Sequence, residues 1–309
     1  MKNIKQKKIA VLMGGLSRER DISLKTGNAI FSSLQTAGYN VIAIDVDEHV
    51  ARVLTEQKPD IAFIALHGKF GEDGCVQGLL ECMHIPYTGS GVLPSALAMD
   101  KDVCKLFAAD HGLAVAKSVC LSVEECSGKL SHSLSYPLVV KPVCEGSTIN
   151  MSIVKTEDEL KPAVEKALLS DERILLEEFI KGTEVTASVL CGEALALIEV
   201  VPASGFYDFE AKYTKGKTEY ILPARISDAL TKEIQKQTVA LMKALRIEGA
   251  ARADYIVDEK GVPYFLEVNT IPGMTETSLV PKAAAFNGMS FLDVCERMLL
   301  SARVKEKVK

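Results

Sequence analysis

The sequence predicts an α/β protein built from two or three domains. Buried-strand patterns at residues 9–13 and 41–44 flank a helical pattern at 23–37, so strand and helix alternate from the start. Two β-rich runs near the end, 251–257 and 262–268, flank a turn and predict a hairpin. With 309 residues, 48% of them hydrophobic, the chain can bury a sizeable core.

The N-terminal part predicts a strand–helix–strand unit. The first strand ends at Gly14 and Gly15, and the following helix ends at Gly38. The intervening GGLSRER lacks the GxGxxG spacing of dinucleotide-binding folds, so a nicotinamide site has little support. Taken alone, the charged residues 18–21 are typical of a solvated turn.

A second buried strand, 61–66, leads into the loop HGKFGEDG at 67–74. Ligands of α/β proteins bind at loops that follow the carboxyl ends of strands. His67 is placed to meet a carboxylate or a phosphoryl group, although a lone histidine is more often structural. A helix is predicted at 76–83, and a change of composition at 88–94 marks the first domain boundary.

The middle of the chain predicts a second unit of strands and helices. Asp100 is placed to cap a helix from 101 to about 110, whose first residue, Lys101, is on its own an ordinary surface lysine. Lys141 stands near the end of a buried strand, 136–142, where a bound phosphate is a sensible counter-ion. The small-residue loop 143–148 lets backbone amides close over phosphates, although it is not a Walker A sequence.

The next elements are a helix at 157–169, an interior strand at 173–180 and a hairpin at 185–201. The segment 202–223 is polar and has no regular period, and its aromatic residues favour a functional loop over disorder. Ser227 is placed to cap a long helix that runs to about residue 246.

The final hairpin carries polar residues that solvent exposure does not explain. A turn at 258–261 predicts a register in which Arg252 lies opposite Glu267 and Asp254 lies opposite Phe265. Tyr255, Val257, Val262, Tyr264, Leu266 and Val268 are then expected on the other, apolar face.

One face of this hairpin gathers Arg252, Asp254, Glu267 and Asn269. Oxygen ligands without His or Cys suit Mg²⁺. The alternative is a solvated face with an Arg252–Glu267 cross-strand pair, which is the more common arrangement in hairpins. The turn at Pro272–Gly273 favours a site, because exposed amides at such a turn bind anions or an oxyanion.

The Thr/Ser run after this turn, at Thr275, Thr277 and Ser278, can cap a helix.

Composition excludes several classes of partner. The net charge of −5 and the pI near 5.7 give no general attraction for nucleic acid or an anionic membrane. The apolar run 9–13 is too short for a signal-peptide core or a membrane span. The eight cysteines lack metal-binding spacing and indicate reduced thiols in a cytoplasmic protein.

The segment RADYIVDEKGVPYFLEVNTIPGMTETSLVP resembles the metal-binding and second-substrate segment of D-alanine:D-alanine ligases, members of the ATP-grasp superfamily. GGLSRER, HGKFGEDG and FYDFEAKY are similar to further family motifs, in the family's order. The resemblance implies an ATP-grasp fold with an N-terminal Rossmann-like (pre-ATP-grasp) βαβ domain at 1–90. It implies a central ATP-grasp lid subdomain at 91–183 and a C-terminal catalytic subdomain at 184–309, with an ω-loop at 203–222.

The implied reaction is ATP-dependent joining of two D-alanines through an acyl phosphate, for peptidoglycan precursor synthesis. By resemblance, Glu19 would hold the ammonium of the first D-alanine and His67 would lie near it. Arg252 and the Gly273 amide would stabilise the tetrahedral intermediate. The residues implied to make contacts on loop closure are Ser147 and Tyr213, and those implied to hold the second carboxylate are Ser278 and Leu279.

The resemblance also implies an ATP site with two Mg²⁺ or Mn²⁺ ions. Glu177 would meet the adenine amino group, Phe179 would pack on the ring, and Glu184 would meet the ribose. Ile180 would add backbone contacts. The implied phosphate ligands are Lys101, Lys141 and Lys212, and the implied metal ligands are Asp254, Glu267 and Asn269.

Three positions depart from the commonest family pattern: Val143–Cys144 before Glu145, Asn150 where glycine is frequent, and Glu178 where lysine is frequent. One alternative function is a D-alanine:D-lactate ligase, against which Tyr213 argues by resemblance. Another is a non-catalytic nucleotide-binding regulator on the same fold. The expected partners are D-alanine, ATP and a second copy in a homodimer.

Overall fold

The computed structural model describes residues 4–128, 130, 132–146, 149–203, 216–275 and 277–305. The N-terminal part forms a three-stranded parallel sheet in the order β2-β1-β3. Its elements are β1 (Ile9–Gly14), α1 (Arg20–Thr36), β2 (Val41–Val46), α2 (Val50–Gln57), β3 (Ile61–Ile64) and α3 (Cys75–Cys82). β1 is buried along its whole length, as expected for a central strand.

Two helices and a short strand connect this domain to a second sheet: α4 (Val92–Met99), α5 (Lys101–Asp110) and β4 (Ala114–Val115). The second sheet is antiparallel, in the order β5-β8-β6-β7, and is called here the lid sheet. Its elements are β5 (Ser118–Ser122), α6 (Val123–Cys126), β6 (Leu138–Pro142), β7 (Ser152–Val154), α7 (Glu157–Leu168) and β8 (Arg173–Glu178). The apolar face of α7 packs on this sheet and forms a separate core.

The third and largest sheet has the order β12-β11-β9-β13-β14-β4, with β10 paired to β9. Its elements and helices are β9 (Gly182–Leu190), β10 (Glu193–Ala194), β11 (Ile198–Pro202), β12 (Thr218–Ile221), α9 (Asp228–Ala244), β13 (Ala250–Asp258), β14 (Pro263–Asn269), α10 (Leu279–Phe286) and α11 (Phe291–Leu300). The predicted final hairpin is confirmed as β13 and β14, which pair antiparallel.

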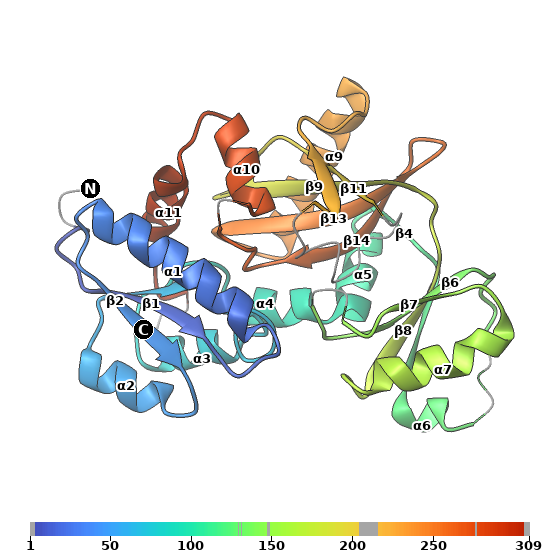
Figure 1. Ribbon diagram of the computed structural model, residues 1–309, viewed down its shortest axis with the longest axis horizontal. Coiled ribbons are helices and arrows are strands. Elements are labelled where there is room, and N and C mark those ends of the chain that lie inside the picture. The colour runs from blue at the N-terminus through green and yellow to red at the C-terminus, as the bar shows by residue number, and fades with distance from the viewer. Residues whose placement is uncertain are drawn as a thin grey trace.

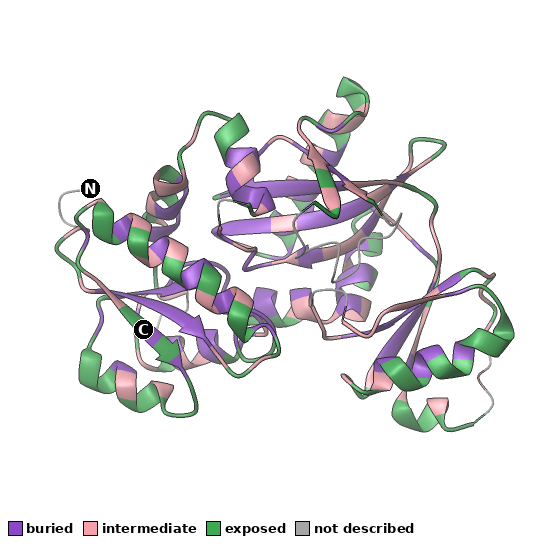
Figure 2. Ribbon diagram, in the orientation of Figure 1, coloured by how far each residue is buried: buried purple, intermediate pink, exposed green. Residues whose placement is uncertain are grey.

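The N-terminal sheet and the lid sheet lie at opposite ends of the molecule, with α4 and α5 between them and the large sheet alongside (Figure 1). The strands carry most of the buried residues, whereas the outer faces of α2, α6 and α7 are exposed (Figure 2). The three sheets therefore meet around α5 and the β13–β14 hairpin.

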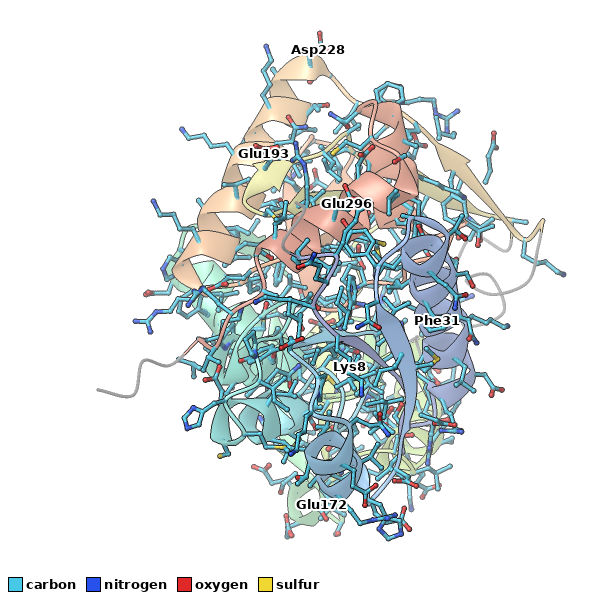
Figure 3. The ribbon with its side chains drawn as sticks, turned by 90° about the vertical axis from the view of Figure 1, so that its left-hand side faces the viewer. Lys8, Phe31, Glu172, Glu193, Asp228 and Glu296 are labelled. Atoms are coloured by element: carbon cyan, nitrogen blue, oxygen red, sulfur yellow. The ribbon has the colours of Figure 1, made fainter. Side chains whose placement is uncertain are left out.

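The last two helices pack on the N-terminal domain. α10 and α11 share one hydrophobic core with β1 and α1, and α1, which carries Phe31, lies beside α11, which carries Glu296 (Figure 3). The Tyr39 hydroxyl donates to Glu296 Oε1 at 2.6 Å. Among the described residues, no helix combines the length and the apolar character that a membrane crossing needs.

Several elements differ from the predictions. Residues 203–222 were expected to be irregular, but Thr218–Ile221 forms β12 and pairs with β11, because this edge position can accept a short strand of β-formers. α2 was not predicted, since it is only eight residues long and Leu54 is its one buried residue. Much of the expected ω-loop, 204–215, lies outside the described residues.

Candidate functional site

Two neighbouring cavities open where the sheets meet. The first, about 290 Å³, lies between α1, the loop after β3 and the β13–β14 hairpin, and is called here the polar cavity. The second, about 420 Å³, lies between the lid sheet and the hairpin, and is called the lid cavity. Lys101 and Glu267 line both, so the cavities share a wall.

Every predicted site residue that the structure describes lines at least one cavity. Those of the polar cavity are Glu19, His67, Lys101, Arg252, Glu267, Asn269, Gly273, Ser278 and Leu279. Those of the lid cavity are Lys101, Lys141, Glu177, Phe179, Ile180, Glu184, Asp254 and Glu267. The remaining three, Ser147, Lys212 and Tyr213, lie outside the described residues.

The hairpin register differs from the prediction. Arg252 lies opposite Asn269 and Asp254 lies opposite Glu267, whereas Glu267 and Phe265 were the expected partners. The prediction was wrong by two residues. Val257 pairs with Pro263 and not with Val262, which accounts for one residue, and the pairing shifts by one more after Asp254, at a β-bulge that the composition does not reveal. The shift places the two carboxylates directly across from each other.

The same shift changes the faces of β14. Phe265 packs on the apolar side against Tyr255, with ring centroids 5.8 Å apart. Leu266, expected on the apolar face, lines the lid cavity with Asp254 instead. Leu266 therefore lies at the site, and Phe265 lies in the core.

Each hairpin carboxylate has a cation beside it. Arg252 donates from Nε and Nη2 to the two carboxylate oxygens of Asp254, both at 2.8 Å. Lys101 Nζ lies 3.5 Å from Glu267 Oε2. Asp254 is buried and Glu267 is half-buried, and two carboxylates on facing strands would repel, so the paired cations offset that repulsion.

The hairpin also offers oxygen donors for a hard cation. Asp254, Glu267 and Asn269 present carboxylate and amide oxygens near the ends of β13 and β14. Asn269 Oδ1 accepts from the Ile271 N–H at 3.0 Å, which orients the amide and leaves an acceptor position. In the described part of the chain, no three His, Cys, Asp or Glu side chains group as a metal site. A cation here therefore needs the amide as well as the two carboxylates, and this donor set fits Mg²⁺ or Mn²⁺.

Glu19 lies at the start of α1, between two glycine-containing loops. It is buried, and a Cβ atom on Gly68 or on Gly146 would lie 2.7 Å or 2.8 Å from its Oε2 atom. Both positions must therefore lack a side chain for the loops to approach this carboxylate. Ser17 lies in the loop after β1, and its hydroxyl donates to the His67 carbonyl at 2.7 Å, which ties this loop to the one that contains Gly68.

His67 is buried at the floor of the polar cavity. Its Nε2 lies 3.1 Å from Thr26 Oγ1, and the Ile271 backbone forms a further hydrogen bond with its ring. Burial, together with the Arg252 charge, lowers the pKa of His67 to about 4, although the Ile271 bond acts in the opposite direction. The imidazole is therefore neutral at pH 7 and ties α1 to the segment after the hairpin.

Glu72 also lines the polar cavity, although the sequence alone assigned it no role. It accepts from the Gly68 N–H at 2.9 Å. Burial, together with the nearby Glu19 charge, raises the pKa of Glu72 to about 8. A neutral Glu72 limits the negative charge beside Glu19.

In the lid cavity, Lys141 pairs with a glutamate. Lys141 Nζ lies 2.6 Å from Glu177 Oε2, and Lys105 contacts Glu177 Oε1. Burial, followed by the Lys141 charge, lowers the pKa of Lys105, whereas the contact with the Glu177 carboxylate favours the charged lysine. The sequence reasoning missed Lys105, whose one signal is its position one helical turn after Lys101.

The start of α10 faces the polar cavity through Ser278 and Leu279. Ser278 occupies the N-cap position, but its Oγ accepts from the Thr275 N–H at 3.0 Å, and among the described residues no side chain caps this helix. The Thr/Ser run thus supplies the N-cap residue of a helix, as expected, but no side-chain cap, because the turn competes for the Ser278 hydroxyl. Uncapped amides at a helix start bind anions.

Comparison with known proteins agrees with this geometry. Family profiles described as D-ala D-ala ligase C-terminus and D-ala D-ala ligase N-terminus match residues 107–300 and 50–90. A D-alanine–D-alanine ligase of Syntrophotalea carbinolica is 52% identical over 304 residues, 98% of each chain.

Solved structures lead to the same family. A Bacillus anthracis D-alanine–D-alanine ligase complexed with ATP has a TM-score of 0.83 and 33% identity, covering 96% of this chain and 97% of that one. The VanG D-Ala:D-Ser ligase of Enterococcus faecalis has a TM-score of 0.78 and 32% identity, covering 96% and 98%. The fold is thus the ATP-grasp fold, and the chain belongs to the D-alanine–D-alanine ligase family.

Proposed function

We propose that the protein joins two molecules of D-alanine to D-alanyl-D-alanine and converts ATP to ADP and phosphate, supplying a peptidoglycan precursor. The observation that carries this proposal is the shared wall of the two cavities. Lys101 and Glu267 face both, so a nucleotide phosphate in the lid cavity and a carboxylate in the polar cavity would meet there. That arrangement suits transfer of a phosphoryl group to a carboxylate.

The polar cavity has groups for both amino acids. Glu19 would bind the ammonium of the first D-alanine from between its two loops. The first turn of α10, at Ser278 and Leu279, would bind the carboxylate of the second. Arg252 and the Gly273 amide would stabilise the negative charge that develops when the second amine attacks the acyl phosphate. The second substrate would therefore approach from the α10 side.

The lid cavity has groups for ATP. Phe179 and Ile180 would contact the adenine, Glu177 its amino group and Glu184 the ribose. Lys101 and Lys141 would neutralise the phosphates, and Lys141 would then leave its pair with Glu177.

Asp254, Glu267 and Asn269 would hold two Mg²⁺ or Mn²⁺ ions, which supply charge neutralisation at the phosphates when bound. Arg252, which pairs with Asp254 in this structure, would then be available to the reacting carboxylate. We further propose that the protein works in the cytoplasm as a homodimer.

The test is phosphate release and dipeptide formation with ATP, Mg²⁺ and D-alanine, compared with D-lactate plus D-alanine and with L-alanine. Glu267→Gln should lower turnover by at least about 100-fold, because it removes a charged metal ligand. Glu259→Gln is the matched control, since Glu259 lies exposed in the turn of the same hairpin. ATP binding without D-alanine-dependent turnover would overturn the proposal, and ester formation with D-lactate in preference to dipeptide would redirect it.

A further inference from the structure

Lys105 is a buried cation that the reaction outlined above does not use. It lies on α5, one turn after Lys101, and only 3% of its surface is exposed. It does not line the lid cavity, whereas Lys141 and Glu177 both do. Lys105 therefore stands behind the cavity wall, where it touches Glu177 but cannot reach a nucleotide.

Glu177 is held by one lysine on each carboxylate oxygen. Lys105 contacts Oε1 from behind the wall, and Lys141 lies 2.6 Å from Oε2 on the cavity side. Glu177 is itself 3% exposed and sits on β8, which is flanked by β5 and β6 in the lid sheet. A carboxylate so buried would be costly without a cation.

The two lysines differ in what they can do next. Lys141 borders the cavity and can turn to nucleotide phosphates, and its departure would expose Oε2 to the amino group of the base. Lys105 has no such alternative, because the wall separates it from the cavity. The charge and the orientation of Glu177 would then depend on Lys105.

We propose that Lys105 is a positioning residue for nucleotide recognition: it keeps Glu177 ionised and oriented, so that Lys141 can move to the phosphates without stranding a buried carboxylate. This inference rests on the proposed nucleotide site in the lid cavity. It assigns Lys105 a role in affinity for the nucleotide and in selectivity for a base with an exocyclic amino group, with no role at the reacting carboxylate.

The test measures binding without turnover, by calorimetric titration of the full chain with MgADP and with MgIDP, whose base lacks that amino group. Lys105→Met should weaken MgADP binding at least tenfold and reduce the preference for MgADP over MgIDP to less than threefold. In a separate turnover assay, the KM for D-alanine should stay within twofold of the wild-type value. Lys232→Met, at an exposed lysine on α9, is the matched control and should change none of these values.

A double-variant cycle shows whether Lys105 acts through Glu177. If it does, adding Lys105→Met to Glu177→Gln should change the MgADP affinity by less than threefold. The inference would be overturned if the losses of MgADP affinity in the two single variants multiplied in the double variant. It would also be overturned if Lys105→Met left the affinity and the base preference unchanged.

Should Lys105→Met fail to fold, the double variant decides, because it neutralises both members of the buried pair. Affinity equal to that of Glu177→Gln supports the inference, and weaker affinity overturns it. A wild-type chain that binds MgADP but forms no dipeptide would overturn the proposed activity, while the variants would still decide the role of Lys105.

Discussion

Acid should destabilise this protein through His67, and replacing that residue should remove the effect. The ordinary pKa of histidine is about 6.5, whereas burial lowers the pKa of His67 to about 4. Between these values the unfolded chain takes up a proton that the folded chain does not. The free energy of unfolding therefore falls as the pH falls from 6.5 towards 4.

The size of the effect follows from those two pKa values. Each pH unit between them corresponds to about 1.4 kcal/mol, so His67 alone should lower the free energy of unfolding by about 2 kcal/mol between pH 6.5 and pH 5. His67→Gln removes the titrating group. It also loses the contact with Thr26 Oγ1, which lowers stability at every pH by about 1 kcal/mol.

The assay is urea unfolding at pH 7.5, 6.0 and 5.0. The wild type should be about 1 kcal/mol more stable than His67→Gln at pH 7.5 and about 1 kcal/mol less stable at pH 5.0. His49→Gln is the control, because His49 is an exposed histidine at the start of α2, and its curve should run parallel to that of the wild type. Parallel curves for the wild type and His67→Gln would refute the assignment of a low pKa to burial of this ring.

Two further substitutions test the packing of the large sheet by the same urea assay. Tyr255→Phe should cost about 1 kcal/mol, because it removes the buried bond between the Tyr255 hydroxyl and Thr238 Oγ1 at 2.8 Å; an unchanged stability would argue against that bond. Gly182→Ala should cost at least about 2 kcal/mol, since the new Cβ atom would lie 2.1 Å from the Val257 carbonyl oxygen. Gly128→Ala should change stability by less than about 0.5 kcal/mol, because among the described residues nothing apart from its chain neighbours lies within 4 Å of the new Cβ, and equal effects at the two glycines would contradict the clash.

Local signals in the sequence predicted elements well where they are strong. Asp100 and Ser227 were expected to cap helices, and both side chains accept from the first turn of α5 and α9. Local signals could not predict the register of the β13–β14 hairpin. Its shift after Asp254 depends on how β13 pairs with both β9 and β14, which is a tertiary property.

At the site, too, local sequence predicted some features and tertiary contacts determined the others. Residue types and the order of motifs predicted which side chains line the cavities, because strand ends and glycine loops leave a clear pattern. The partners of those side chains were not predictable. The pairing of Glu177 with Lys141 and Lys105 requires β8, β6 and α5 to meet, and no local pattern encodes that meeting.

The common wall of the two cavities has a thermodynamic consequence. Lys101 faces both spaces and lies 3.5 Å from Glu267, so a ligand that draws Lys101 away on one side changes the charge that the other side presents. Affinities on the two sides are then linked. Whatever factor a nucleotide applies to amino-acid binding, the amino acid must apply to nucleotide binding, because the cycle of binding steps closes.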